Sequence, residues 1–89
     1  MSLTNRQLIE SYIDHPDPDC FHGVRRANNL FAHCGVLHSY AEPIARYKEG
    51  VFTVSRKKWS LTTTRHVNTL LGILSQQGKT YVITQERLI

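Results

Sequence analysis

The sequence predicts an α+β domain in which two N-terminal helices precede a small sheet and one further helix precedes the last strand. Three observations predict this class. Apolar residues recur at helical spacing over residues 4–14 and 20–34, short runs rich in β-branched residues follow from Val36, and helical spacing returns before Gly78. The sheet is expected to be mostly antiparallel, with three or four strands. All 89 residues are expected to form a single domain, 1–89, because a chain of this length has room for one core.

The first helix is predicted over residues 4–14. Thr4 and Gln7 have the spacing of a capping box, in which each side chain bonds to the backbone of the other residue. The apolar stripe comprises Leu8, Ile9, Tyr12 and Ile13. Pro16 and Pro18 end the helix, because proline cannot continue the hydrogen-bond ladder.

The second helix is predicted over residues 20–34. Its apolar positions recur at spacings of 4, 3, 4 and 3, at Cys20, Val24, Ala27, Phe31 and Cys34. Asp19 is expected to cap its start, and Gly35 stands where a glycine commonly ends a helix. This stripe places both cysteines in the core as small apolar residues.

A sheet is predicted after the second helix. Val36–Tyr40 and Ile44–Lys48 have extended patterns, and Pro43 between them predicts a sheet edge or a bend. Gly50 suits a turn that joins Ile44–Lys48 to the β-branched run Val51–Ser55, so these two strands are expected to form a hairpin.

The third helix is predicted to begin within the hydroxyl-rich run 60–64. We expect Thr62 or Thr63 to cap it, because serine and threonine favour helix caps over helix interiors. Its apolar stripe comprises Val67, Leu70, Leu71 and Leu74. Gly78 is expected to end the helix, and Tyr81–Thr84 is predicted to be the last strand.

Charge is distributed unevenly along the chain. The 11 lysine and arginine residues outnumber the 7 acidic residues and give a formal net charge of +4, yet residues 1–24 are net negative. Residues 25–89 are strongly basic, which predicts nucleic acid or an acidic protein surface as partner, with plain solubility as the alternative. No apolar run reaches the roughly 20 residues of a membrane span, and no secretory leader is visible. We therefore expect no membrane contact, a cytoplasmic location, and free thiols at Cys20 and Cys34.

Cysteine and histidine side chains could serve as metal ligands or as catalytic groups. The possible ligands are Cys20, His22, His33, Cys34 and His38. Their spacing matches no common zinc pattern, so we expect no metal and no cofactor. Cys34 could act as a nucleophile beside a histidine, but no catalytic motif accompanies it. We expect a protein that is not an enzyme, and a small hydrolase or metal-dependent enzyme is the least favoured alternative.

The start of the third helix combines hydroxyls, free amides and a cation. A helix N-terminus with Thr62, Thr63 and Arg65 nearby suits an anion such as phosphate, a nucleic-acid backbone or an acidic side chain. The alternative is an ordinary cap with spare threonines. His66 falls in the first turn, where the helix dipole disfavours its protonated form.

Residues 46–65 form the main candidate interface. They interleave cations with Tyr47, Phe52 and Trp59, and single-strand and RNA recognition uses this combination to neutralise phosphates and stack on bases. A protein-facing or merely solvated surface is the alternative. The residues expected to contact nucleic acid or another partner are Arg46, Lys48, Arg56, Lys57, Lys58, Trp59, Thr63 and Arg65.

Three stretches of the sequence resemble a group of viral proteins. They are Ser39-Tyr40-Ala41-Glu42-Pro43-Ile44-Ala45, Gly50-Val51-Phe52-Thr53-Val54 and Trp59-Ser60-Leu61-Thr62-Thr63-Thr64-Arg65-His66. They resemble the SYxxPIA strand, the glycine hairpin and the (Y/W)SxTTxxH helix start of small uncharacterised proteins encoded by bacterial and archaeal viruses, phages and prophages. The resemblance covers roughly residues 36–74. It implies a viral accessory protein that acts by binding in the host cytoplasm.

The sequence therefore predicts a non-enzymatic accessory protein of the phage type that contacts nucleic acid through its basic hairpin face. The alternative is an anti-CRISPR-like inhibitor, which would bind a host antiviral defence complex through protein–protein contacts. An exposed hairpin edge would also allow a homodimer to form.

Overall fold

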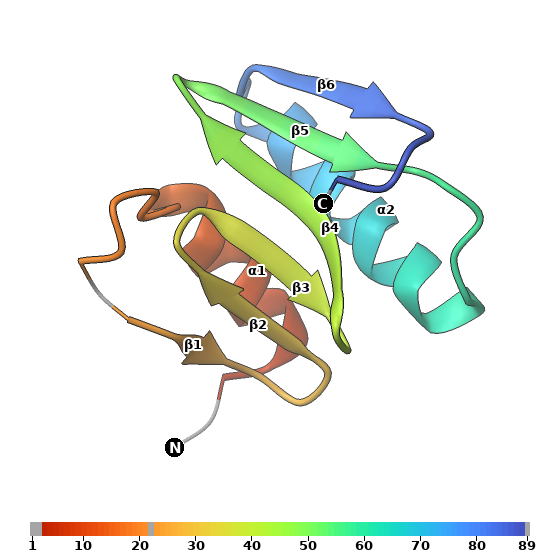
Figure 1. Ribbon diagram of the computed structural model, residues 1–89, viewed down its shortest axis with the longest axis horizontal. Coiled ribbons are helices and arrows are strands. Elements are labelled where there is room, and N and C mark those ends of the chain that lie inside the picture. The colour runs from red at the N-terminus through yellow and green to blue at the C-terminus, as the bar shows by residue number, and fades with distance from the viewer. Residues whose placement is uncertain (1–2, 22, 89) are drawn as a thin grey trace.

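The computed structural model describes residues 3–21 and 23–88 (Figure 1). The elements in chain order are helix α1 (Asn5–Asp14), strands β1 (Arg25–Arg26), β2 (Leu30–His33), β3 (Val36–Ser39), β4 (Glu42–Lys48) and β5 (Val51–Ser55), helix α2 (Leu61–Gln76) and strand β6 (Tyr81–Thr84). The strands form one six-stranded sheet in sequence order. Strands β1 to β5 pair antiparallel, whereas β6 pairs parallel to β5, because α2 carries the chain back along the sheet. Within the described residues, neither helix has the length and apolar character that crossing a membrane requires.

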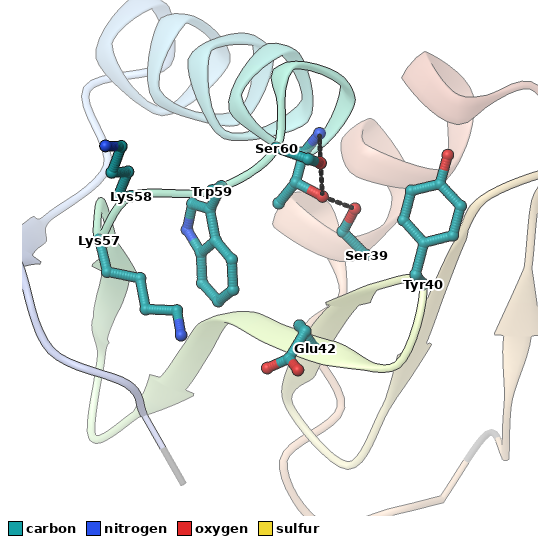
Figure 2. Close-up of a pocket in the computed structure, with 8 residues that line it drawn as sticks. Ser39, Tyr40, Glu42, Lys57, Lys58, Trp59 and Ser60 are labelled. Atoms are coloured by element: carbon teal, nitrogen blue, oxygen red, sulfur yellow. Dashed lines mark hydrogen bonds between the residues drawn. The ribbon is translucent and has the colours of Figure 1, made fainter.

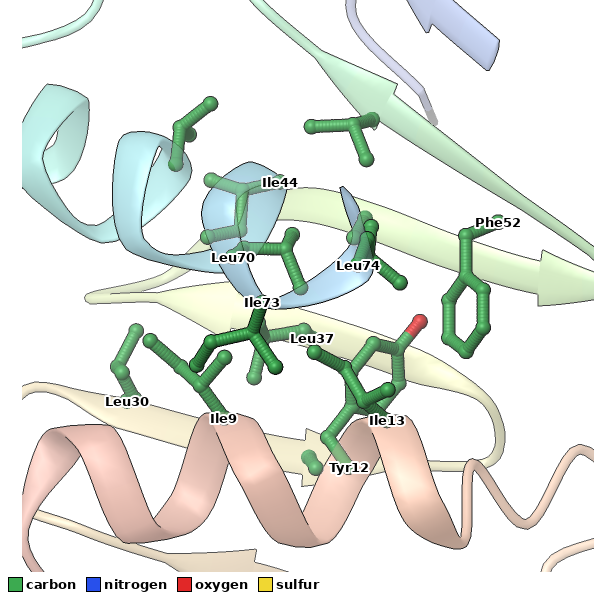
Figure 3. Packing of buried hydrophobic residues seen from close by; sticks show 14 of the residues in the cluster. Ile9, Tyr12, Ile13, Leu30, Leu37, Ile44, Phe52, Leu70, Ile73 and Leu74 are labelled. Atoms are coloured by element: carbon green, nitrogen blue, oxygen red, sulfur yellow. The ribbon is translucent and has the colours of Figure 1, made fainter. Parts of the chain in front are cut away.

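Both helices pack on the same face of the sheet (Figure 1), and one core fills the space between them (Figure 3). Its fully buried residues include Leu8, Ile9, Tyr12, Ile13, Leu37, Ile44, Val54, Val67, Leu70 and Leu74. The Tyr12 hydroxyl donates to the carbonyl of Gly35 at 2.8 Å, and its ring meets Phe52 edge-on with 5.6 Å between ring centres. Burial raises the pKa of Tyr12 far above its usual value, so this side chain remains a neutral donor that joins α1 to the sheet.

The prediction for the first helix is confirmed. α1 begins after Thr4, whose hydroxyl accepts from the Gln7 amide at 3.1 Å. The Gln7 side chain accepts from the Thr4 amide at 3.0 Å, which completes the capping box. The four residues predicted to form the apolar stripe are the buried residues of this helix.

The predicted second helix over residues 20–34 is wrong. The chain there forms a loop followed by β1 and β2, and Gly35 lies in the two-residue turn of the β2–β3 hairpin. Cys34 and Gly35 have φ values of 53° and 81°, the pattern of a type I′ turn. Leu30 and Ala32 are both buried, because alternate residues of a strand face the same side of the sheet. The apolar residues of this stretch therefore suit a strand as well as a helix. Pairing with β3 selects the strand over the helix, and no feature within residues 20–34 indicates that pairing.

The expectation of free thiols is also wrong. Cys20 and Cys34 form a disulfide, with their Cα atoms 4.4 Å apart. Gly35 lets the preceding loop cross this hairpin turn, because a Cβ at that position would lie 3.0 Å from the Cα of Pro18. Neither cysteine is part of the core, since Cys20 is exposed and Cys34 is half-buried. Asp19 lies in the same loop and caps no helix.

The predicted hairpin is confirmed as β4 and β5, joined by Glu49 and Gly50 with φ values of 53° and 82°. Pro43 lies inside β4, which is an interior strand and not an edge. The register between β3 and β4 shifts between Leu37 and His38. This β-bulge accommodates the proline, because the hydrogen-bond ladder is interrupted there. The hairpin also offers no free edge for a dimer, since β3 and β6 flank it and the sheet ends at β1 and β6.

The third helix begins earlier than predicted. Ser60, and not Thr62 or Thr63, caps α2, because the Ser60 hydroxyl accepts from the Thr63 amide at 3.3 Å. The last strand is confirmed over Tyr81–Thr84. The sheet is mostly antiparallel as predicted but wider than three or four strands, because the segment misread as a helix contributes β1 and β2.

Candidate functional site

A pocket lies where the β3–β4 turn meets the start of α2 (Figure 2). Its volume is about 330 Å³, and ligand sites typically span about 300–1,000 Å³. The lining residues are Ser39, Tyr40, Glu42, Lys57, Lys58, Trp59, Ser60 and Thr63. Figure 2 shows Trp59 and Tyr40 on opposite sides of the pocket, with Ser39 and Ser60 between them and Glu42 below.

The Trp59 side of the pocket is held in place by two contacts. The indole Nε1–H donates to the carbonyl of Ser55 at 2.9 Å. The Nζ of Lys57 lies 4.6 Å from the ring centre, a cation–π contact worth about 0.5–1 kcal/mol at exposed positions. This wall therefore combines a fixed aromatic ring with a positive charge.

A buried hydrogen-bond network lies beneath the pocket and joins α1, β3 and α2. The Ser39 Oγ lies 3.0 Å from the Thr63 Oγ1 and 2.9 Å from the His66 Nδ1. The His66 Nε2 lies 3.4 Å from the side-chain nitrogen of Asn5. Ser39 is completely buried, and burial lowers the pKa of His66, so the imidazole is neutral.

The hydrogen bonds of this network orient His66 as a donor toward Ser39. The Asn5 amide nitrogen donates to the His66 Nε2, which places the ring proton on Nδ1, and Nδ1 therefore donates to the Ser39 hydroxyl. Serine catalysis needs an imidazole nitrogen that accepts the hydroxyl proton. The Ser39 and Thr63 hydroxyls also share a hydrogen bond, so these residues fix the base of the pocket. Cys34, the nucleophile considered from the sequence, is held in the disulfide.

Glu42 brings a negative charge into the pocket. Its Oε2 lies 3.3 Å from the Nη2 of Arg87, an ion pair that lacks the alignment of a hydrogen bond. Within the described residues this buried oxygen has no hydrogen-bond partner. Both side chains are partly exposed, so the pair contributes no more than about 1 kcal/mol. Arg87 offsets the charge of Glu42 but leaves its acceptor capacity unused.

The pocket gathers four of the predicted site residues, Lys57, Lys58, Trp59 and Thr63. Thr63 differs from the other three, because its hydroxyl is occupied by Ser39 inside the network. The predicted anion site at the helix start is also partly occupied, because the Ser60 hydroxyl caps the helix. Arg56 and Arg65 are exposed but do not line the pocket.

Arg46 and Lys48 lie elsewhere on the molecule. Both are exposed on β4 near the β4–β5 turn, whereas Lys57 follows the opposite end of β5. A five-residue strand spans about 17 Å, so the predicted basic hairpin face is divided into two separate groups. Tyr47, considered for base stacking, is half-buried against Phe52 with 4.7 Å between ring centres.

Four lining residues are absent from the predicted site residues: Ser39, Tyr40, Glu42 and Ser60. The first three belong to the SYxxPIA stretch, and Ser60, with Trp59, belongs to the (Y/W)SxTTxxH stretch on the other side of the pocket. No spacing rule joins the two stretches, because the end of β4 and the whole of β5 separate them in the chain. The one sequence signal for this pocket was the presence of the two stretches, because the fold brings residues of both to the same pocket.

A second aromatic and basic group lies on the sheet face away from the helices. Phe31 and His38 pair across β2 and β3, and their rings stack with centres 4.3 Å apart. The guanidinium carbon of Arg26 lies 5.5 Å from the Phe31 ring centre. Burial, with a smaller contribution from the charge of His33, lowers the pKa of His38. Because these groups cover one another's faces, they offer less ring surface to a base than the pocket does.

Comparison with known proteins identifies a family but no activity. The model described as "Family of unknown function (DUF8033)" matches residues 3–87. No curated protein and no solved structure gives a significant match.

Proposed function

This chain belongs to the family of unknown function DUF8033, and we propose that it is a non-enzymatic protein that binds single-stranded nucleic acid at the pocket beside α2. One observation carries this proposal. Lys57, Lys58 and Trp59 line one pocket, and Tyr40 stands on its other side (Figure 2). The proposed interface is thus one end of the hairpin and the start of α2, and it excludes Arg46 and Lys48.

The charge of the pocket supports an anionic ligand. Among the described residues, neither Lys57 nor Lys58 forms an ion pair, and the one carboxylate in the pocket is paired with Arg87. Lys57 contacts the Trp59 ring and neither lysine is paired with a carboxylate, so both positive charges are able to neutralise phosphates. Each phosphate contact on a single strand adds about 0.7 to the slope of log affinity against log salt concentration.

The aromatic residues support a base between the two walls. Trp59 is half-buried and Tyr40 is 53% exposed, so both rings reach the pocket surface. Stacking of a base on an aromatic side chain is worth about 1–3 kcal/mol. Glu42 lines the pocket, and a carboxylate accepts from the exocyclic amino group of a base, so cytosine, adenine and guanine should bind better than thymine or uracil.

The resemblance to phage and prophage proteins supports an accessory role for this activity. We include in the proposal that the protein acts in the host cytoplasm, where single-stranded nucleic acid occurs during replication and transcription. The competing class is the anti-CRISPR-like inhibitor, whose partner is a protein of the host defence complex.

Fluorescence anisotropy with labelled oligodeoxycytidine and oligothymidine, at several salt concentrations, tests the proposal. We expect binding that weakens with salt and favours oligodeoxycytidine. The Lys57→Gln/Lys58→Gln variant should bind at least tenfold more weakly, with a salt slope reduced by about 1.4, because two phosphate contacts are lost. Tyr40→Asn should weaken binding without altering the salt slope, because it removes a stacking ring and no phosphate contact. Asparagine is chosen because it tolerates the positive φ of this position, 56°.

The matched control is Lys48→Gln/Lys79→Gln. It removes the same charge from the other end of β5. Lys79 lies near that end, because the Phe52 amide donates a hydrogen bond to the carbonyl of Thr80, the next residue. Binding by this control should match that of the unmodified chain. Equal losses in the two double variants would contradict the pocket. No binding even at low salt would reject nucleic acid as the ligand and favour the protein-binding inhibitor.

A further inference from the structure

We propose that the chain, once its disulfide is reduced, binds a thiophilic divalent ion of the zinc type through Cys20, His33 and Cys34. One ligand atom from each of the three side chains lies within 4.8 Å of the others. Cys20 and His33 are exposed and Cys34 is half-buried, so an ion from solution reaches them directly. The group lies away from the pocket, and this inference does not depend on the proposed function.

The fold brings these ligands together from two segments. His33 ends β2 and Cys34 begins the type I′ turn, so neighbouring residues supply two of the ligands. Cys20 comes from the loop that crosses this turn. That crossing requires Gly35, because any Cβ there would contact Pro18. All three residues are among the possible ligands named from the sequence, which were set aside because their spacing matches no common zinc pattern and both cysteines fall on a predicted helical stripe.

The distances suit tetrahedral coordination after small side-chain rotations. Zinc–sulfur and zinc–nitrogen bonds of about 2.3 and 2.0–2.1 Å put tetrahedral ligand atoms about 3.4–3.8 Å apart. The two sulfur atoms are bonded in the disulfide and must move apart after reduction, whereas the His33 nitrogen lies within 4.8 Å of both sulfurs and must move closer. Rotations of these side chains supply both movements. Three protein ligands leave a fourth position for water or another donor. His22 lies outside the described residues, and His38 is stacked on Phe31, so neither is part of the proposed ligand set.

The disulfide and the metal complex are alternative states of the same two cysteines. A dithiol reductant donates two electrons and two protons to the Cys20–Cys34 bond, which yields two thiols while the reductant becomes a disulfide. The two thiols then lose their protons and bind the ion as thiolates, with neutral His33 as the third ligand. A reducing environment maintains the dithiol state.

Cobalt titration of the full-length chain, reduced with a phosphine that does not bind the ion, tests this proposal. We expect a 1:1 complex with thiolate-to-cobalt charge-transfer absorption that zinc displaces. The chain with its disulfide intact should show no such band. His33→Ala should weaken cobalt binding by at least tenfold, whereas His15→Ala, another exposed histidine that is not part of the group, should leave it unchanged.

Circular dichroism shows whether the reduced chain remains folded, so that every outcome of the cobalt titration tests the proposal. If the chain stays folded and shows no cobalt band, or if His33→Ala binds as tightly as the unmodified chain, the proposal is overturned. If reduction unfolds the chain, zinc should restore the folded spectrum. Failure of zinc to restore the spectrum would overturn the proposal equally.

Discussion

Gly35 shows how one residue determines the arrangement of the N-terminal half of the chain. Its φ of 81° lies in a region that residues with a Cβ rarely adopt. Its carbonyl accepts from the Tyr12 hydroxyl and from the Tyr47 amide, each at 2.8 Å, so α1 and β4 are both bonded to this turn. The loop that carries Cys20 crosses directly over it.

We predict that Gly35→Ala destabilises the protein by at least about 2 kcal/mol, because the left-handed conformation and the contact with Pro18 each carry a cost. Urea unfolding measures the change. The matched control is Gly72→Ala, which lies within α2 and has open space around its Cα. This control should gain up to about 1 kcal/mol from helix propensity. Equal effects in the two variants would refute the role assigned to Gly35.

The neutral state of His66 predicts a pH dependence of stability. Burial lowers the pKa of His66 in the folded chain, so the unfolded chain binds this proton more readily. Stability is therefore fully present above the unfolded pKa, about 6.5, and falls as the pH drops below it. Urea unfolding between pH 7.5 and 5 should show this loss, and His66→Asn should reduce its slope. A slope unchanged in His66→Asn but altered in the exposed control His15→Asn would contradict this account.

At the scale of elements, correct predictions came from signals contained within one element. The capping box specifies the start of α1, and the turn before Val51 specifies the β4–β5 hairpin, because neighbouring residues form these contacts. The stretch 20–34 failed because its apolar spacing suits a helix or a strand, and only pairing with distant residues decides. Only half of the residues that line the pocket were predicted, for the same reason. Tyr40 and Trp59 face the same pocket only because β4 and β5 pair between them.

The start of α2 supplies a direct test at this scale. We predict that Ser60→Ala costs about 1 kcal/mol of stability, because the Thr63 amide loses its cap. Thr62→Ala should cost less than half as much, since Thr62 caps nothing. Urea midpoints of the two variants measure the difference. A larger loss of stability in Thr62→Ala than in Ser60→Ala would contradict the cap at Ser60 and support the predicted cap at Thr62.

At the scale of the whole molecule, four of the seven acidic residues lie in a different region from the cations of the pocket. The acidic residues Glu10, Asp14, Asp17 and Asp19 belong to α1 and the loop after it, and Glu10 is paired with Arg6 at 3.7 Å. The cations of the pocket come from the segment between β5 and α2. An anionic ligand is therefore directed away from the N-terminal loop and toward the pocket, because like charges repel it at one region and lysines attract it at the other.

The central claim is that single-stranded nucleic acid binds at the pocket and not along the whole basic hairpin. Titration of the ¹⁵N-labelled chain with oligodeoxycytidine, followed by ¹H–¹⁵N correlation spectra, tests both the binding and its position. The account predicts that the largest shifts occur in residues 39–42 and 57–60 and in the indole N–H of Trp59, the one tryptophan in the chain. Shifts confined to residues 46–51, or no shifts at all, would contradict it.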